Sequence, residues 1–274
     1  MGKLKIVVNG CSYTYGAESV IPGVQTHEDN FNNSYPILLD KKLKNGKVIN
    51  LAACGKSNAT IFCQTINYLF DNPYQNNDIV FIIQWTWPER WPRFRGKRDT
   101  NEGRDLLQGL WLEDNSAHSM NLKEEGYINE LNFQACENLT YSYICALMNM
   151  FDNMNIRHLH YMSTSIESHL PKFWLDLLPD LLKPDLSPKF QSGPHREFIK
   201  YNLDNLINKI RNHDGFVMDN WSSHMMEKNK EKYVYNSGEG EGIQHPDKQS
   251  HQEWTDELIE ILLNKGYISS EEIL

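Results

Sequence analysis

Short apolar runs that alternate with helical patterns are the feature that most restricts the fold of this 274-residue chain. The strand-like runs lie at 4–8, 47–51, 79–84, 156–162 and 215–219. The helical patterns lie at 34–43, 58–70, 129–154, 194–211 and 247–264. Strands separated by helices pair in parallel and carry helices on both faces of the sheet. We therefore expect a three-layer α/β/α sandwich with a flavodoxin-like, parallel five-stranded sheet.

The length suits one large α/β domain, and neither an internal repeat nor a low-complexity linker divides the chain. We expect a single domain over 1–274, with insertions at about 85–126 and 163–192. The first insertion is rich in Trp and Arg, and the second contains four prolines. Long irregular segments inside a compact domain are often functional, so we expect both to lie above the sheet edge.

Composition excludes several classes of function. The net charge of −9 disfavours nucleic-acid binding, which needs a basic surface. The mean hydropathy is −0.59, and no apolar run approaches the ~18 residues of a membrane helix. With no leader-like start and five scattered cysteines, the expected location is the cytoplasm. The ten histidines form no recognised metal-binding motif, so we expect no metal and no cofactor.

The first strand ends in a tight turn that carries a serine. The run 4–8 is followed by Asn9, Gly10, Cys11 and Ser12, and Gly16 closes the segment. Such a turn places the Ser12 hydroxyl at the carboxyl end of a strand, where open α/β sheets bind ligands.

Two later segments contain residues that suit a serine nucleophile. Gly55 follows the second strand, and its backbone N–H can donate to a developing oxyanion, although a simple turn also uses a glycine. Ser57 or Asn58 can then cap the next helix. The second segment lies near the end of the chain, where His245 directly precedes Pro246.

The first segment resembles the G-D-S-x-[ST]-x-G motif of the SGNH (GDSL-type) hydrolases. Gly10, Ser12, Thr14 and Gly16 match it, whereas Cys11 stands where the family usually has Asp. The resemblance implies that Ser12 is the nucleophile and that its own N–H contributes to the oxyanion hole.

The second and third blocks of the family have weaker counterparts. The segment around Gly55 resembles the second block, which implies a place for Gly55 in the oxyanion hole. The third block, G-x-N-D, lacks its Asn here. Thr86 stands at that position and has a hydroxyl that can donate one hydrogen bond, and Gln84 is the alternative donor.

The fourth block, D-x-x-H-P, matches at His245 and Pro246 and implies that His245 is the catalytic base. Its Asp falls on Gly242, which has no side chain to orient the imidazole. We favour Glu241 for that role. The alternatives are Glu239, Asp219, or a Ser-His dyad whose His is held by a backbone carbonyl.

A basic aromatic patch follows the third strand and includes Trp87, Arg90 and Trp91. These side chains can stack on sugar rings or hold an anionic substrate. The alternatives are a packed interface and a surface for single-stranded nucleic acid.

These features together predict a serine esterase or deacylase that forms an acyl-enzyme, with O-acetyl groups of a carbohydrate as the candidate substrate. The expected partner is a small-molecule or glycan ester, and the oligomeric state is left open. One alternative is a non-catalytic binding or structural protein that retains the fold. Another is an acyltransferase that uses the same site.

Overall fold

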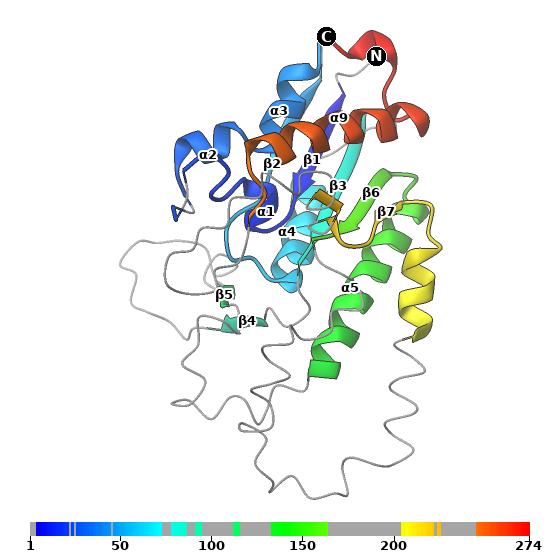
Figure 1. Cartoon of the computed structure of the whole chain (residues 1–274). Helices are drawn as coiled ribbons and strands as arrows, with labels where there is room; N and C mark the ends of the chain where they lie inside the picture. The colour runs from blue at the N-terminus through cyan, green and yellow to red at the C-terminus, as the bar shows by residue number, and fades with distance from the viewer. Residues whose placement is uncertain are drawn as a thin grey trace, which may run out of the picture.

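In the computed structural model, five parallel strands form one sheet in the order β2-β1-β3-β6-β7 (Figure 1). The strands are β1 (Lys5–Asn9), β2 (Lys47–Asn50), β3 (Ile79–Trp85), β6 (Arg157–Met162) and β7 (Phe216–Met218). All five lie where the sequence predicts strands. The structure describes residues 4–21, 23–24, 26–44, 46–72, 78–86, 91–94, 112–115, 133–163, 204–221, 224–225 and 245–274, with backbone alone at 91–94, 112–115 and 133–136.

The helices connect the strands and follow the last of them. They are α1 (Ser12–Tyr15), α2 (Glu28–Asn32), α3 (Tyr35–Lys42), α4 (Asn58–Asp71), α5 (Phe133–Asn153), α9 (Lys248–Asn264), the 3-10 turn η4 (Ser270–Glu272) and helical residues 204–211. Within the described residues, the helical predictions hold. The short helix α2 was not predicted, because five residues are too few to show a helical period.

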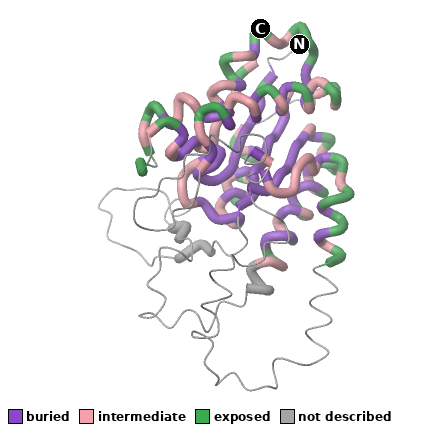
Figure 2. The backbone as a smooth tube through the Cα atoms, viewed as in Figure 1, coloured by how far each residue is buried: buried purple, intermediate pink, exposed green. Residues whose placement is uncertain are grey.

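Successive side chains along each strand point to opposite faces of the sheet, which divides the core into two layers. Ile6 and Val8 face α3 and α9, whereas Val7 faces α4 and α5. Figure 2 shows the buried sheet between more exposed helices. The predicted three-layer α/β/α sandwich with a flavodoxin-like sheet is therefore confirmed. None of the helices in the described part of the chain is long and apolar enough to cross a membrane.

The first insertion is only partly described. Its strands β4 (Trp91–Phe94) and β5 (Leu112–Asn115) pair antiparallel. Because most of the stretch lies outside the described residues, the expectation that it is mostly irregular stays a prediction. Trp85 belongs to β3 and is fully buried, with its indole N–H donating to His160 Nδ1 at 3.0 Å. Of the second insertion, only Ser163 lies within the described residues.

Candidate active site

The turn after β1 presents Ser12 as the first residue of α1, with Cys11 as the N-cap. The backbone here is packed too closely for a side chain at position 10. A Cβ on Gly10 would overlap Thr14 Oγ1 and lie 2.7 Å from Gln84 Oε1. Gly16 ends α1 at a φ of +83°, a conformation that residues with a side chain rarely adopt. The two glycines that carry the motif are therefore required by geometry.

The side chain of Gln84 holds this turn through hydrogen bonds to Thr14. Its Oε1 is buried and accepts hydrogen bonds from the Thr14 backbone N–H, at 3.1 Å, and from the Thr14 hydroxyl. Gln84 lies on β3, the strand beside β1, so the contact joins α1 to the centre of the sheet. These contacts use the amide oxygen of Gln84 and hold α1 in place. The oxyanion-donor role considered for Gln84 would use its Nε2 and remains a prediction.

Three side chains from distant parts of the chain form one line of hydrogen bonds. His245 Nε2 lies 2.9 Å from the Ser12 hydroxyl oxygen. The other ring nitrogen, Nδ1, lies 2.8 Å from Glu18 Oε2. This is the order carboxylate, imidazole, hydroxyl that activates a serine in hydrolases.

The surroundings keep this group largely out of water. The side chain of His245 is 3% exposed and that of Glu18 is 19% exposed. The Tyr13 ring packs on the imidazole with a centroid distance of 5.1 Å. The hydrogen bond from His245 lowers the pKa of Glu18 and outweighs the opposite effect of burial. Glu18 is therefore held as a carboxylate, the form that can accept the Nδ1 proton.

Glu18 is a residue of the candidate site that the sequence did not point to. Glu241, Glu239 and Gly242 lie outside the described residues, and Asp219 pairs with Arg211 at 2.9 Å. Glu18 is separated from His245 by 227 positions and belongs to no motif. The one local signal is its place just after Gly16, in the connection that starts at the same sheet edge as Ser12.

The predicted oxyanion donors lie at the ends of neighbouring strands. Gly55 follows β2 with a φ of +80°, and Ser57 caps α4 by accepting from the Thr60 N–H at 3.2 Å. Thr86 follows β3 and is buried, and its backbone N–H donates to Asn58 Oδ1 at 2.8 Å. The donor roles of Ser12 N–H, Gly55 and Thr86 remain predictions.

The roles of the predicted substrate-binding residues remain predictions. Trp87 and Arg90 lie outside the described residues, and Trp91 begins β4 with only its backbone described. The Trp85 side chain is inside the core, so for this residue the packing alternative is correct.

Elsewhere in the described residues, one group has the side chains of a metal site. Asp152 lies between two imidazoles, with Oδ1 3.0 Å from His158 Nε2 and Oδ2 2.8 Å from His213 Nε2. However, His213 Nδ1 accepts a hydrogen bond from the Gly215 N–H at 2.9 Å, so neutral His213 carries its proton on Nε2. That nitrogen then donates to Asp152, and a metal would have to displace this proton. The contacts favour a hydrogen-bonded cluster.

No protein-family model and no curated protein matches this chain. Solved structures of other proteins do match it. A member of the lipolytic G-D-S-L family from Veillonella parvula is 13% identical, with 94% of this chain and 97% of that one covered and a TM-score of 0.47. A lipase/acylhydrolase from Enterococcus faecalis is 10% identical, with 96% of each chain covered and a TM-score of 0.44. A psychrotrophic esterase from Pseudoalteromonas is 11% identical, with coverages of 95% and 98% and a TM-score of 0.43.

The first of these proteins is described as a lipolytic protein of the G-D-S-L family, the second as a lipase/acylhydrolase and the third as an esterase. At these identities, and with TM-scores below 0.5, the likeness carries no argument about this chain.

Proposed function

We propose that this protein is a divergent SGNH-type serine hydrolase that cleaves carboxylic esters. The observation that carries the proposal is the line of hydrogen bonds from Glu18 through His245 to Ser12, at 2.8 and 2.9 Å. The turn that brings Ser12 into this line needs its glycines. A chance contact of the same three residue types at the carboxyl edge of a parallel sheet would have no such requirement.

In the proposed reaction, His245 Nε2 takes the proton of Ser12 as the Ser12 oxygen attacks the ester carbonyl carbon. The N–H groups of Ser12 and Gly55, with the Thr86 hydroxyl, donate to the oxyanion that forms. His245 then gives its proton to the departing alcohol, leaving an acyl group on Ser12. Water attacks this acyl group with His245 again as base, which releases the acid and restores the hydroxyl.

Glu18 has a separate task in this scheme. It accepts the Nδ1 proton, which keeps the lone pair of Nε2 directed at Ser12 and stabilises the imidazolium that forms in each step. For the substrate we propose an O-acetyl ester of a carbohydrate. The support for it is that the insertion with Trp87, Arg90 and Trp91 starts where β3 ends, at the sheet edge that holds Ser12.

A serine-directed fluorophosphonate probe and hydrolysis of p-nitrophenyl acetate test the proposal. We expect the wild type to be labelled on Ser12 and Ser12→Ala to lose both labelling and turnover. Ser250→Ala is the matched control, because its buried hydroxyl contacts no partner among the described residues and it lies five positions after His245. Labelling of Ser12→Ala at the wild-type rate, or a wild type that neither labels nor turns over, would contradict the proposal and favour a non-catalytic protein.

A further inference from the structure

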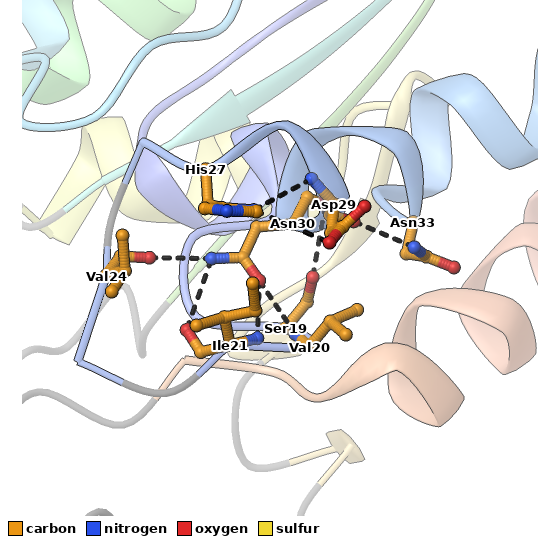
Figure 3. Close-up of polar contacts among 8 residues, drawn as sticks. All are labelled: Ser19, Val20, Ile21, Val24, His27, Asp29, Asn30 and Asn33. Atoms are coloured by element: carbon orange, nitrogen blue, oxygen red, sulfur yellow. Dashed lines mark hydrogen bonds and ion pairs between the residues drawn. The ribbon is translucent and has the colours of Figure 1, made fainter.

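The residues around Glu18 are arranged about one buried amide, that of Asn30 (Figure 3). Asn30 Oδ1 accepts hydrogen bonds from the backbone N–H of Val20, at 2.9 Å, and of Ile21, at 2.7 Å. Asn30 Nδ2 donates to the carbonyl oxygens of Ile21, at 3.3 Å, and of Val24, at 2.6 Å. One side chain on α2 therefore replaces the hydrogen bonds that a regular element would give this stretch.

Asparagine is suited to this place for a chemical reason. Its amide offers two donors and an acceptor within one short side chain, and all are used here. The Asn30 side chain is fully buried, and it reaches backbone groups of residues that are themselves partly exposed. Aspartate would keep the acceptor but lose both donors, and alanine would leave four backbone groups without this partner.

The segment fixed in this way, residues 17–21, which we name the Glu18 segment, carries its carboxylate in an uncommon backbone conformation. Glu18 has a φ of +59°, which residues with a side chain adopt only when their surroundings require it. The next residue, Ser19, is held on two sides. Its hydroxyl donates to the Asn30 carbonyl oxygen at 3.1 Å, and its own carbonyl oxygen accepts from the Lys248 N–H at 2.9 Å.

The contact with Lys248 connects the two partners of the candidate site. Lys248 begins α9, three positions after His245. The position of Glu18 is thus set relative to α2 and to the helix that follows the proposed base. We propose that Asn30 is a positioning residue, which acts on the reaction only through Glu18 by holding its carboxylate against His245 Nδ1. This inference rests on the proposed function.

The test compares Asn30→Ala with Asn33→Ala. Asn33 is the matched control because it ends the same helix and its side chain donates to the Asp29 carbonyl oxygen at 2.7 Å, within α2. We expect Asn30→Ala to lower kcat about 10²-fold with little change in KM, since misplacing a catalytic group by about 1 Å has this order of effect. Asn33→Ala should keep the wild-type kcat.

A double variant separates the positioning role of Asn30 from a purely structural role. If Asn30 acts through Glu18, then adding Asn30→Ala to Glu18→Gln should change kcat by less than about twofold, because the interaction it serves is already lost. If the loss of kcat in the double variant equals the product of the two single losses, the inference is overturned. An unchanged kcat in folded Asn30→Ala would overturn it as well. Ser19→Ala removes one contact of the same segment, so it provides the same comparison if Asn30→Ala does not fold.

A readout that needs no turnover distinguishes failure of this inference from failure of the proposed function. The proton on His245 Nδ1, shared with a carboxylate, gives a low-field NMR resonance. We expect that resonance in the wild type and in Asn33→Ala, and its loss in Glu18→Gln and Asn30→Ala. A wild type that shows the resonance but fails to label would overturn the hydrolase and leave the role of Asn30 standing. Retention of the resonance in Asn30→Ala would overturn that role.

Discussion

Two carboxylate–imidazole groups lie at opposite edges of the same sheet, and only one of them contacts a nucleophile. At the carboxyl edge, Glu18 holds His245 at 2.8 Å. At the other edge, near the start of β6, Asp152 holds His158 and His213 at 3.0 and 2.8 Å. The pair contacts are equivalent in length and chemistry.

The difference lies in what the second ring nitrogen of each histidine meets. For His245 it is the Ser12 hydroxyl. For His213 it is the backbone N–H of Gly215. The second ring nitrogen of His158 is buried and has no hydrogen-bond partner among the described residues. A carboxylate beside a histidine is therefore no sign of catalysis by itself. The second nitrogen must be free to exchange a proton with a reacting group.

The largest expected effect comes from neutralising each carboxylate in turn. Glu18→Gln should lower kcat by about 10³- to 10⁴-fold, because an amide does not stabilise the imidazolium and can select the wrong tautomer. Asp152→Asn should leave kcat within about twofold, since its histidines take no part in the proposed reaction. Steady-state kinetics on the two folded variants measures this, and an equal loss in both would remove the distinction between the edges.

A smaller effect is expected from adding one methyl group at each edge. Gly10→Ala places a Cβ 2.7 Å from Gln84 Oε1, and Gly215→Ala places one 2.8 Å from His158 Nδ1. Both should destabilise the protein by about 1–3 kcal/mol through overpacking. Only Gly10→Ala should also slow fluorophosphonate labelling, about 10²-fold, because it moves the turn that carries Ser12. Urea unfolding and labelling rates test the pair, and slow labelling of Gly215→Ala would contradict the comparison.

The smallest effect concerns acid stability. The pKa of Glu18 is lowered from 4.5 by the hydrogen bond from His245. For Asp152, burial acts to raise the pKa, but the hydrogen bonds from His158 and His213 outweigh it and lower the pKa from 3.8. A lowered folded-state pKa stabilises the fold above the ordinary value and loses this contribution as pH falls through the folded value.

The stability difference between the wild type and each neutral variant should therefore be full at pH 6 to 7. It should shrink below about pH 4.5 for Glu18→Gln and only below about pH 3.8 for Asp152→Asn. Urea unfolding at a series of pH values measures both differences. A difference that grows on acidification would mean that the carboxylate is not the stabilising form.

Much of the fold was predictable because it depends on local pattern. The run 79–84 has no polar residue before Gln84, which predicts a strand buried on both faces, and β3 is buried throughout. The position of Ser12 was predictable for a similar reason, since Gly10 and Gly16 bound the turn in the sequence itself. The prediction of a histidine base also came from neighbouring residues, His245 and Pro246, and the structure brings this side chain to Ser12.

The parts that escaped prediction depend on contacts between distant residues. The sequence offered the Gln84 amide as an alternative oxyanion donor but gave no sign that its oxygen accepts hydrogen bonds from Thr14. Trp85 stood beside the other aromatic residues of the insertion, yet the strand continues through it and buries it. In both cases the side-chain direction followed from the strand register.

The sequence by itself determined the order of strands and helices, the turn that carries Ser12 and the histidine that the family resemblance offers as a base, because each depends on residues within a few positions of one another. Only the tertiary structure decided which carboxylate meets that histidine. Glu18 reaches His245 because the Glu18 segment is bound to Asn30 on one side and to Lys248 on the other. Contacts of this kind exist only after the chain has folded, since they depend on the path of a connection that has no repeating pattern of its own.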